Sequence, residues 1–198
     1  MDVFTAKGGF QMNGKLINQN SRQKWVFDGF IVNDVCINAS FPGVKKVSGC
    51  LSFFGQENPH PTFGKGFKGK VFVDFQGIDV EVSALGVFGN IGGYKYFMID
   101  ALAKFNPGIG TGAIQLIGFG GGASYHMSIE GDLDTGLPSD IQVVDPSTVS
   151  LGSSLSNIIY LPNNENGMSI HATVVLALAK EEAFNINATF GVSFYSNG

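Results

Sequence analysis

The chain has 198 residues and a formal net charge of −4, and only 14 % of its residues are charged, against about 25 % in typical soluble domains. Its 28 glycines and 18 phenylalanines favour strands, tight turns and an aromatic core, whereas a helical bundle would need far more Ala, Leu, Glu and Lys. Because no basic patch is present, we expect no nucleic-acid partner. The longest near-apolar run, 172–179, is too short for a transmembrane helix, so we also expect no transmembrane segment.

The first part of the chain reads as strands at 9–18, 24–41 and 46–54. A polar turn at 18–21 separates the first two. In the second run, apolar residues of one parity alternate with Asp28, Asp34 and Asn38, as in a half-buried strand. The proline-bearing loop at 56–62 is a possible minor boundary, although we expect a single domain over 1–198.

The stretch 66–131 alternates between apolar and polar residues, which indicates strands with one dry and one wet face. A hairpin turn at 89–93 is predicted to join strands 78–88 and 94–105, and Asn106-Pro107-Gly108 is predicted to form the next turn. Strands at 113–119 and 124–130 flank a triple glycine.

Residues 131–156 are rich in Asp, Pro and Ser, and we expect one long irregular connection there, with a short helix at 150–156. Strands return at 157–161, 169–179 and 184–195, with a turn at 180–182. The sequence therefore predicts an all-β fold, mainly antiparallel, as a sandwich or a strongly curved open barrel. Its start, which is unlike a signal peptide, and its end directly after a strand suggest a fragment of a longer chain.

The two cysteines lie on the strands 24–41 and 46–54, on either side of a turn signal around Gly43. If Gly43 is the centre of this hairpin, residues whose numbers sum to 86 face each other, and Cys36 and Cys50 fulfil this condition. A non-hydrogen-bonded cross-strand pair lies within disulfide range. Two interpretations stay open: a cross-strand disulfide in an oxidising compartment, or two buried free thiols.

The triple glycine Gly120-Gly121-Gly122 completes a GxGxxG/A pattern that begins at Gly118. A dinucleotide site requires a helix next, but the residues that follow alternate like a strand. We therefore interpret these three residues as structural glycines, at a kink or where another backbone or a large aromatic side chain packs closely. We expect no cofactor.

No catalytic or metal-ligating constellation stands out. The three histidines, His60, His126 and His171, lie far apart in sequence, and neither a GxSxG elbow nor an HExxH motif is present. The acidic stretch 132–145 lacks the order of ligands of an EF-hand, and a solvated loop is the simpler interpretation. Aromatic residues between 94 and 125 could line a carbohydrate- or lipid-binding surface, but at strand spacing they more often belong to a core. We expect no enzymatic activity.

Several segments resemble one family. They are 48–54, 63–69, 94–101, 117–127 and 182–185, of which the run Ile117-Gly118-Phe119-Gly120-Gly121-Gly122-Ala123 is the most specific. The chain is similar to a β-rich segment of very large, uncharacterised proteins of Bacteroidota, although Ile117 and Ser124 stand where the family has Tyr. The resemblance implies a module within a long chain that is exported or loaded into a secretion or contractile injection machine. It transfers no catalytic residue.

We therefore expect a non-enzymatic structural or binding module of a giant exported protein, secreted or at the cell surface. Its expected partners are neighbouring domains of the same long chain and export or injection machinery. Two alternatives stay open: a cargo or toxin domain delivered by an injection or secretion system, and a lipid-binding β-groove. The groove requires an apolar cavity that is open to solvent.

Overall fold

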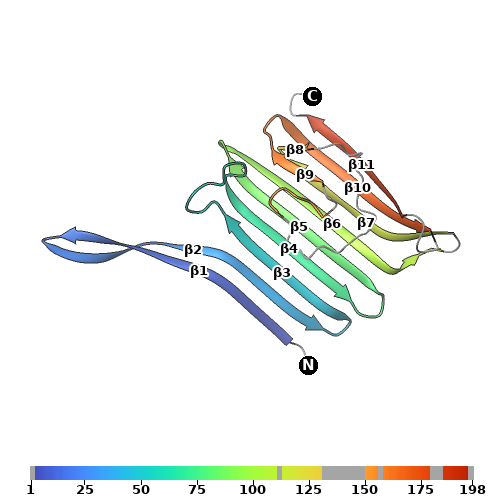
Figure 1. The fold of residues 1–198 in the computed structure, drawn as a ribbon, viewed down its shortest axis with the longest axis horizontal. Coiled ribbons are helices and arrows are strands. Elements are labelled where there is room, and N and C mark those ends of the chain that lie inside the picture. Colours follow the sequence, from blue (N-terminus) through green and yellow to red (C-terminus); the bar gives the residue numbers. More distant parts are fainter. Residues whose placement is uncertain (1–2, 111–112, 131–149, 156–157, 179–184, 196–198) are drawn as a thin grey trace.

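The computed structural model describes residues 3–110, 113–130, 150–155, 158–178 and 185–195. These residues form a nine-stranded antiparallel sheet in the order β1-β2-β3-β4-β5-β6-β7-β10-β11, and a separate pair, β8-β9 (Figure 1). The strands are β1 (Val3–Gln19), β2 (Arg22–Phe41), β3 (Val44–Phe54), β4 (Lys65–Phe75), β5 (Val80–Ile91), β6 (Tyr94–Ile109), β7 (Ile114–Tyr125), β8 (Met127–Glu130), β9 (Ile159–Pro162), β10 (Asn166–Leu178) and β11 (Asn185–Tyr195).

The predicted all-β, mainly antiparallel class is confirmed. The large sheet is not closed into a barrel, since β1 and β11 are its two edges. Neighbouring strands of β1 to β7 follow each other directly in the chain, as expected for strands joined by tight hairpins. Gly43, Gly77 and Gly93 have positive φ in the turns between β2 and β3, β4 and β5, and β5 and β6, a conformation that glycine adopts without steric cost.

Three predicted elements are wrong. Residues 106–108 do not reverse the chain, because β6 continues to Ile109. They form an irregularity within this strand, where its register with β7 shifts between Lys104 and Ile109. The triple glycine does not separate two strands, because β7 runs through it, paired with β6 and β10. Residues 150–155 form turns and one isolated bridge rather than a helix. The turn predicted at 180–182 and most of the expected connection at 131–156 lie outside the described residues.

The two faces of the sheet have different surroundings. One face, here called the covered face, packs against β8, β9 and the turns at 150–155. Its core joins side chains from β5 and β6 to side chains of the covering segments: Leu85, Val87, Tyr96, Met98, Leu102, Phe63, Met127, Leu155, Ile158 and Tyr160. The opposite face, here called the open face, carries the alternate residues of the same strands. Burial alternates accordingly along β5 and β6.

The hairpin β1–β2 extends beyond the sheet as a long two-stranded arm (Figure 1). β2 pairs with β1 along its whole length, but it pairs with β3 only from Asp34 onward. Large apolar side chains on this arm are exposed: Phe10, Met12, Leu16, Trp25, Phe27 and Phe30. A two-stranded hairpin without a third strand buries little surface of its own, so the arm contributes little to the core.

Candidate binding face

The open face is apolar over most of its width. Four successive cross-strand rows, which begin on β3 at Phe53, Leu51, Gly49 and Val47, run from β3 to β10. Apart from the hydroxyl group of Tyr125, every residue in these rows is Gly, Ala or a larger apolar residue. Many side chains of this face are more than a third exposed: Val35, Ile37, Phe53, Phe67, Val71, Ile99, Phe119, Tyr125, Ile170, Phe190 and Val192.

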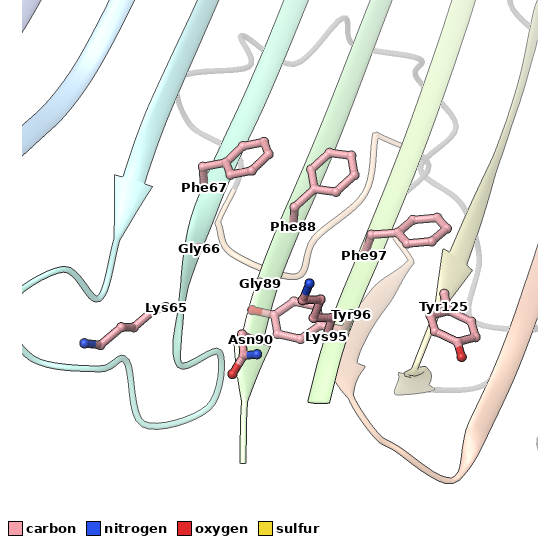
Figure 2. Close-up of a pocket in the computed structure, with 10 residues that line it drawn as sticks. All are labelled: Lys65, Gly66, Phe67, Phe88, Gly89, Asn90, Lys95, Tyr96, Phe97 and Tyr125. Atoms are coloured by element: carbon pink, nitrogen blue, oxygen red, sulfur yellow. The ribbon is translucent and has the colours of Figure 1, made fainter. Parts of the chain in front are cut away.

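An aromatic ridge crosses the open face along the first of these rows. Phe67, Phe88, Phe97 and Tyr125 lie side by side on β4 to β7, as Figure 2 shows. The ring centroids of neighbours are 5.0, 6.0 and 6.1 Å apart, with near-parallel planes. Such spacing is typical of stabilising cross-strand aromatic pairs. Of the aromatic residues considered as a possible binding surface, Phe97, Phe119 and Tyr125 lie on the open face, whereas Tyr96 is buried in the core.

A groove lies directly beside the ridge. Its floor includes Gly49, Gly69 and Gly86, on β3, β4 and β5, and its walls include Leu51, Val71 and Ile99. It has a volume of about 650 Å³. Because glycine has no side chain, β4 and β5 present only backbone at Gly69 and Gly86, in the row next to the ridge. At the other side of the ridge, the exposed side chains of Lys65, Asn90 and Lys95 line a second hollow of about 400 Å³.

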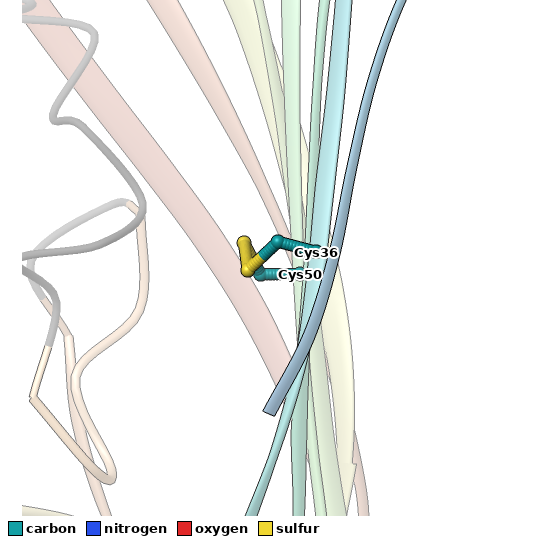
Figure 3. The surroundings of a disulfide bond; sticks show 2 residues. All are labelled: Cys36 and Cys50. Atoms are coloured by element: carbon teal, nitrogen blue, oxygen red, sulfur yellow. A yellow bond between two sulfur atoms is a disulfide. The ribbon is translucent and has the colours of Figure 1, made fainter. Parts of the chain in front are cut away.

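The two cysteines face each other on β2 and β3, at the register that a sum of 86 predicts, and their sulfur atoms form a disulfide. Their Cα atoms are 4.1 Å apart. Gly43 is not the centre of the hairpin, because the register shifts between Ala39 and Phe41 and the turn consists of Pro42 and Gly43. The disulfide lies on the covered face, in the row of Leu85, and Figure 3 shows its sulfur atoms projecting from one side of the sheet.

The triple glycine lies where neighbouring backbones approach closely. A Cβ atom on Gly120 would be 2.8 Å from the carbonyl oxygen of Ala101, and one on Gly121 would be 2.7 Å from that of His171. Gly122 lies on the covered face, where a Cβ atom would also be 2.6 Å from Cε1 of the His171 ring. These contacts support the structural interpretation of the three glycines.

A buried polar network links the covered face to β9. Nε2 of His171 is 3.2 Å from Oδ1 of Asp100, and its Nδ1 is 3.0 Å from the hydroxyl oxygen of Tyr160. Because a carboxylate only accepts hydrogen bonds, Nε2–H donates to Asp100, and Nδ1 of a neutral ring accepts from the Tyr160 hydroxyl. Burial, together with the charge of Asp100, raises the pKa of Tyr160, which keeps its proton available for this hydrogen bond.

This network places a carboxylate and a histidine in line, as hydrolase triads do, but its third member is a phenol rather than Ser, Thr or Cys. All three side chains are buried. Sequence reasoning missed the network because its members are far apart in the chain and no motif joins them. The other histidines have backbone partners: His60 Nδ1 accepts from the N–H groups of Thr62 and Phe63, and His126 Nδ1 donates to the carbonyl of Lys95.

A buried lysine lies on the covered face. Lys68 is 7 % exposed, and its ammonium group donates to the carbonyl of Ser150. Burial, and to a lesser degree the charge of Lys70, lowers the pKa of Lys68 to about 8. The covered face therefore carries polar and charged groups among its core residues, whereas the four central rows of the open face carry no charged residue.

Among the described residues, no group of three or more His, Cys, Asp or Glu side chains is arranged to hold a metal ion. The acidic stretch 132–145 lies outside the described residues. The part of the chain that the structure describes also contains no helix long and apolar enough to cross a membrane. Comparison with protein-family models, curated proteins and solved structures finds no significant match to this chain.

Proposed function

We propose that this chain is a non-enzymatic binding module, whose open face is a docking layer within a larger protein assembly. The observation that carries this proposal is that the polar face of the sheet is covered while the apolar face is exposed. The chain covers the face that bears Lys68, Asp100 and His171 with its own segments, whereas none of the described segments packs on its most apolar face. A sheet that buries one face normally buries the apolar one.

The extent of the open face supports the same proposal. With roughly half of an area of about 150–200 Å² exposed per large side chain, its apolar surface amounts to about 1,000 Å². Monomeric soluble proteins rarely expose contiguous apolar patches beyond about 300–600 Å². A patch of this size marks a surface that another molecule covers. The expected partners, neighbouring domains of a long chain or an export machine, belong to this proposal.

Hydroxyl-radical footprinting tests the proposal on the isolated chain and on the assembly purified from its native source. Phe67 and Phe119 are expected to react in the isolated chain and to be protected in the assembly. The buried Phe63, 5 % exposed, sets the lower limit of reactivity, and the urea-unfolded chain sets the upper limit. Equal reactivity of Phe67 and Phe119 in both samples would show that the open face is not a docking layer.

One observation favours a second function, the binding of an amphiphile. The groove beside the ridge is apolar and open to solvent, and Lys65 and Lys95 lie at the far side of the ridge, where they could pair with an anionic headgroup. Dodecanoate is a suitable probe. Saturable binding to a monomeric chain, lost in a Gly69→Phe variant that fills the groove, would favour this function over the docking layer.

A further inference from the structure

We infer that the open face binds a second copy of this chain, face to face, with Phe67 and Phe88 of each copy seated over Gly69 and Gly86 of the other. This inference rests on the proposed function and names the partner. It draws on the positions of ridge and groove, on the charge of the face and on its area.

The ridge and the groove occupy neighbouring positions on the same strands. On β4, Phe67 belongs to the ridge and Gly69 to the groove, and on β5 the corresponding pair is Phe88 and Gly86. Residues two apart on a strand point to the same face and lie about 6.5–7 Å from each other. The two rows are therefore parallel, and they are one side-chain spacing apart.

This arrangement is self-complementary under a two-fold axis. Consider an axis parallel to the rows, halfway between ridge and groove and just above the sheet. Rotation about it places a second sheet on the open face and brings Phe67 of each copy opposite Gly69 of the other, and Phe88 opposite Gly86. The same rotation brings Phe97 opposite Ile99 and Tyr125 opposite Ala123, so the contacts of Phe with Gly lie on β4 and β5. A contact of this kind is isologous and closes at two copies. Sheets that pack face to face are about 10 Å apart, which leaves room for one interdigitated layer of side chains.

The charge and the area of the face agree with a second copy. Like charges meet wherever a charged surface packs on itself, but the rows of Phe67 and Gly69, which meet across this axis, carry no charged residue. The row of Lys65 and Lys95 lies opposite the apolar row of Val71, so no like charges face each other. Approximately 1,000 Å² of apolar surface per copy exceeds the roughly 800 Å² per partner of a standard stable interface. A partner recognised by charge would find nothing to pair with in these rows.

Sedimentation velocity on the whole chain tests the inference across a range of concentrations. The wild-type chain is expected to form dimers. Phe67→Gly removes part of the ridge and is expected to weaken the dimer at least tenfold. Gly69→Phe fills the groove and is expected to give a monomer. A Cβ atom on Gly69 would lie 3.7 Å from Leu51 Cδ1, an ordinary van der Waals distance, and the ring would extend into the groove.

The double variant Phe67→Gly/Gly69→Phe exchanges ridge and groove on β4. Because the same two-fold axis still places Phe opposite Gly, this variant is expected to recover the dimer that each single variant loses. Gly29→Phe is the matched control, since a Cβ atom on Gly29 has no neighbour within 4 Å and this residue lies on the β1–β2 arm. The control is expected to leave the dimer unchanged. Circular dichroism checks that every variant is folded.

Three results would overturn the inference: a wild-type chain that stays monomeric at 100 µM or so, a dimer that survives Gly69→Phe, or a double variant that does not recover. A monomeric chain whose Phe67 and Phe119 are protected in the native assembly would refute only the second copy as the partner, and the proposed docking layer would stand. If the wild-type chain dimerises and Gly69→Phe does not affect it, another surface, such as the arm, forms the contact.

Discussion

Replacing Tyr160 with Phe is expected to destabilise the fold, although it removes only one hydroxyl group. This hydroxyl donates to Nδ1 of His171, 3.0 Å away, in surroundings where both side chains are buried. Without it, the nitrogen atom remains a buried acceptor that has lost its donor. A buried polar group left in this state costs about 1–3 kcal/mol. The Nε2–H hydrogen bond to Asp100 also loses the polarisation that a continuous chain of hydrogen bonds provides.

Urea-induced unfolding, followed by circular dichroism, measures this loss. With a slope of about 2 kcal/mol per molar urea, a loss of about 2 kcal/mol lowers the midpoint by about 1 M. Tyr94→Phe is the matched control, because Tyr94 is only partly buried and its ring packs edge-on against His126. Its effect is expected to stay below about 0.5 kcal/mol. Equal midpoints for the two variants would refute the stabilising role of the network.

Three further predictions follow from the covered face. Reducing the Cys36–Cys50 disulfide, or replacing both residues with Ala, is expected to lower the free energy of unfolding by about 3 kcal/mol, because either change releases a loop of about 15 residues in the unfolded chain. Denaturant titrations measure this loss, and an unchanged midpoint would contradict the prediction. The pKa of Lys68 is lowered to about 8 in the fold, so the unfolded chain binds more protons at this group between pH 8 and its unfolded pKa near 10.5. The free energy of unfolding is therefore expected to rise relative to that of Lys68→Met between pH 8 and 10, and equal slopes would refute this. Gly122→Ala is expected to lower the melting temperature more than Gly29→Ala, because its methyl group would overlap the His171 ring and the carbonyl of Ile99.

The parts of the fold that could be predicted from the sequence depend on short-range geometry. Cys36 and Cys50 were predicted to face each other from a turn centred on Gly43. The turn is formed by Pro42 and Gly43, and the register shift between Ala39 and Phe41 restores the predicted pairing. The prediction for 106–108 failed although Asn, Pro and Gly favour a turn. β6 and β7 pair on both sides of these residues, so they form an irregular bulge within a longer strand. Turn chemistry alone does not distinguish a reversal from a bulge.

Only part of the candidate site could be predicted from the sequence. The alternation of Phe67, Gly69 and Val71 with Lys68 and Lys70 predicts two unlike faces. It does not indicate which face the chain covers with its own distant segments. The polar face was expected to be exposed to solvent, but the turns at 150–155 cover it. The network of Asp100, Tyr160 and His171 depends on the same covering contact, and therefore no local pattern signals it.

The two faces differ in how they can fix the position of a partner layer. On the covered face, the hydrogen bond from Tyr160 to His171 and the hydrogen bond from Lys68 to Ser150 are directional, and they set where β9 and the turns at 150–155 lie. The open face lacks such groups over its central rows, so a flat apolar surface alone would allow a partner to slide. Only the shape of the surface can fix the register of a partner there. On β4 and β5 this shape is given by the ridge of Phe67 and Phe88 beside the groove at Gly69 and Gly86. Shape complementarity at this step therefore has to provide the specificity of the interface. Non-specific association depends only on the amount of apolar surface, so it would tolerate either single variant at Phe67 or Gly69. A specific interface would be lost in each single variant and recovered in the double variant, which conserves the apolar surface.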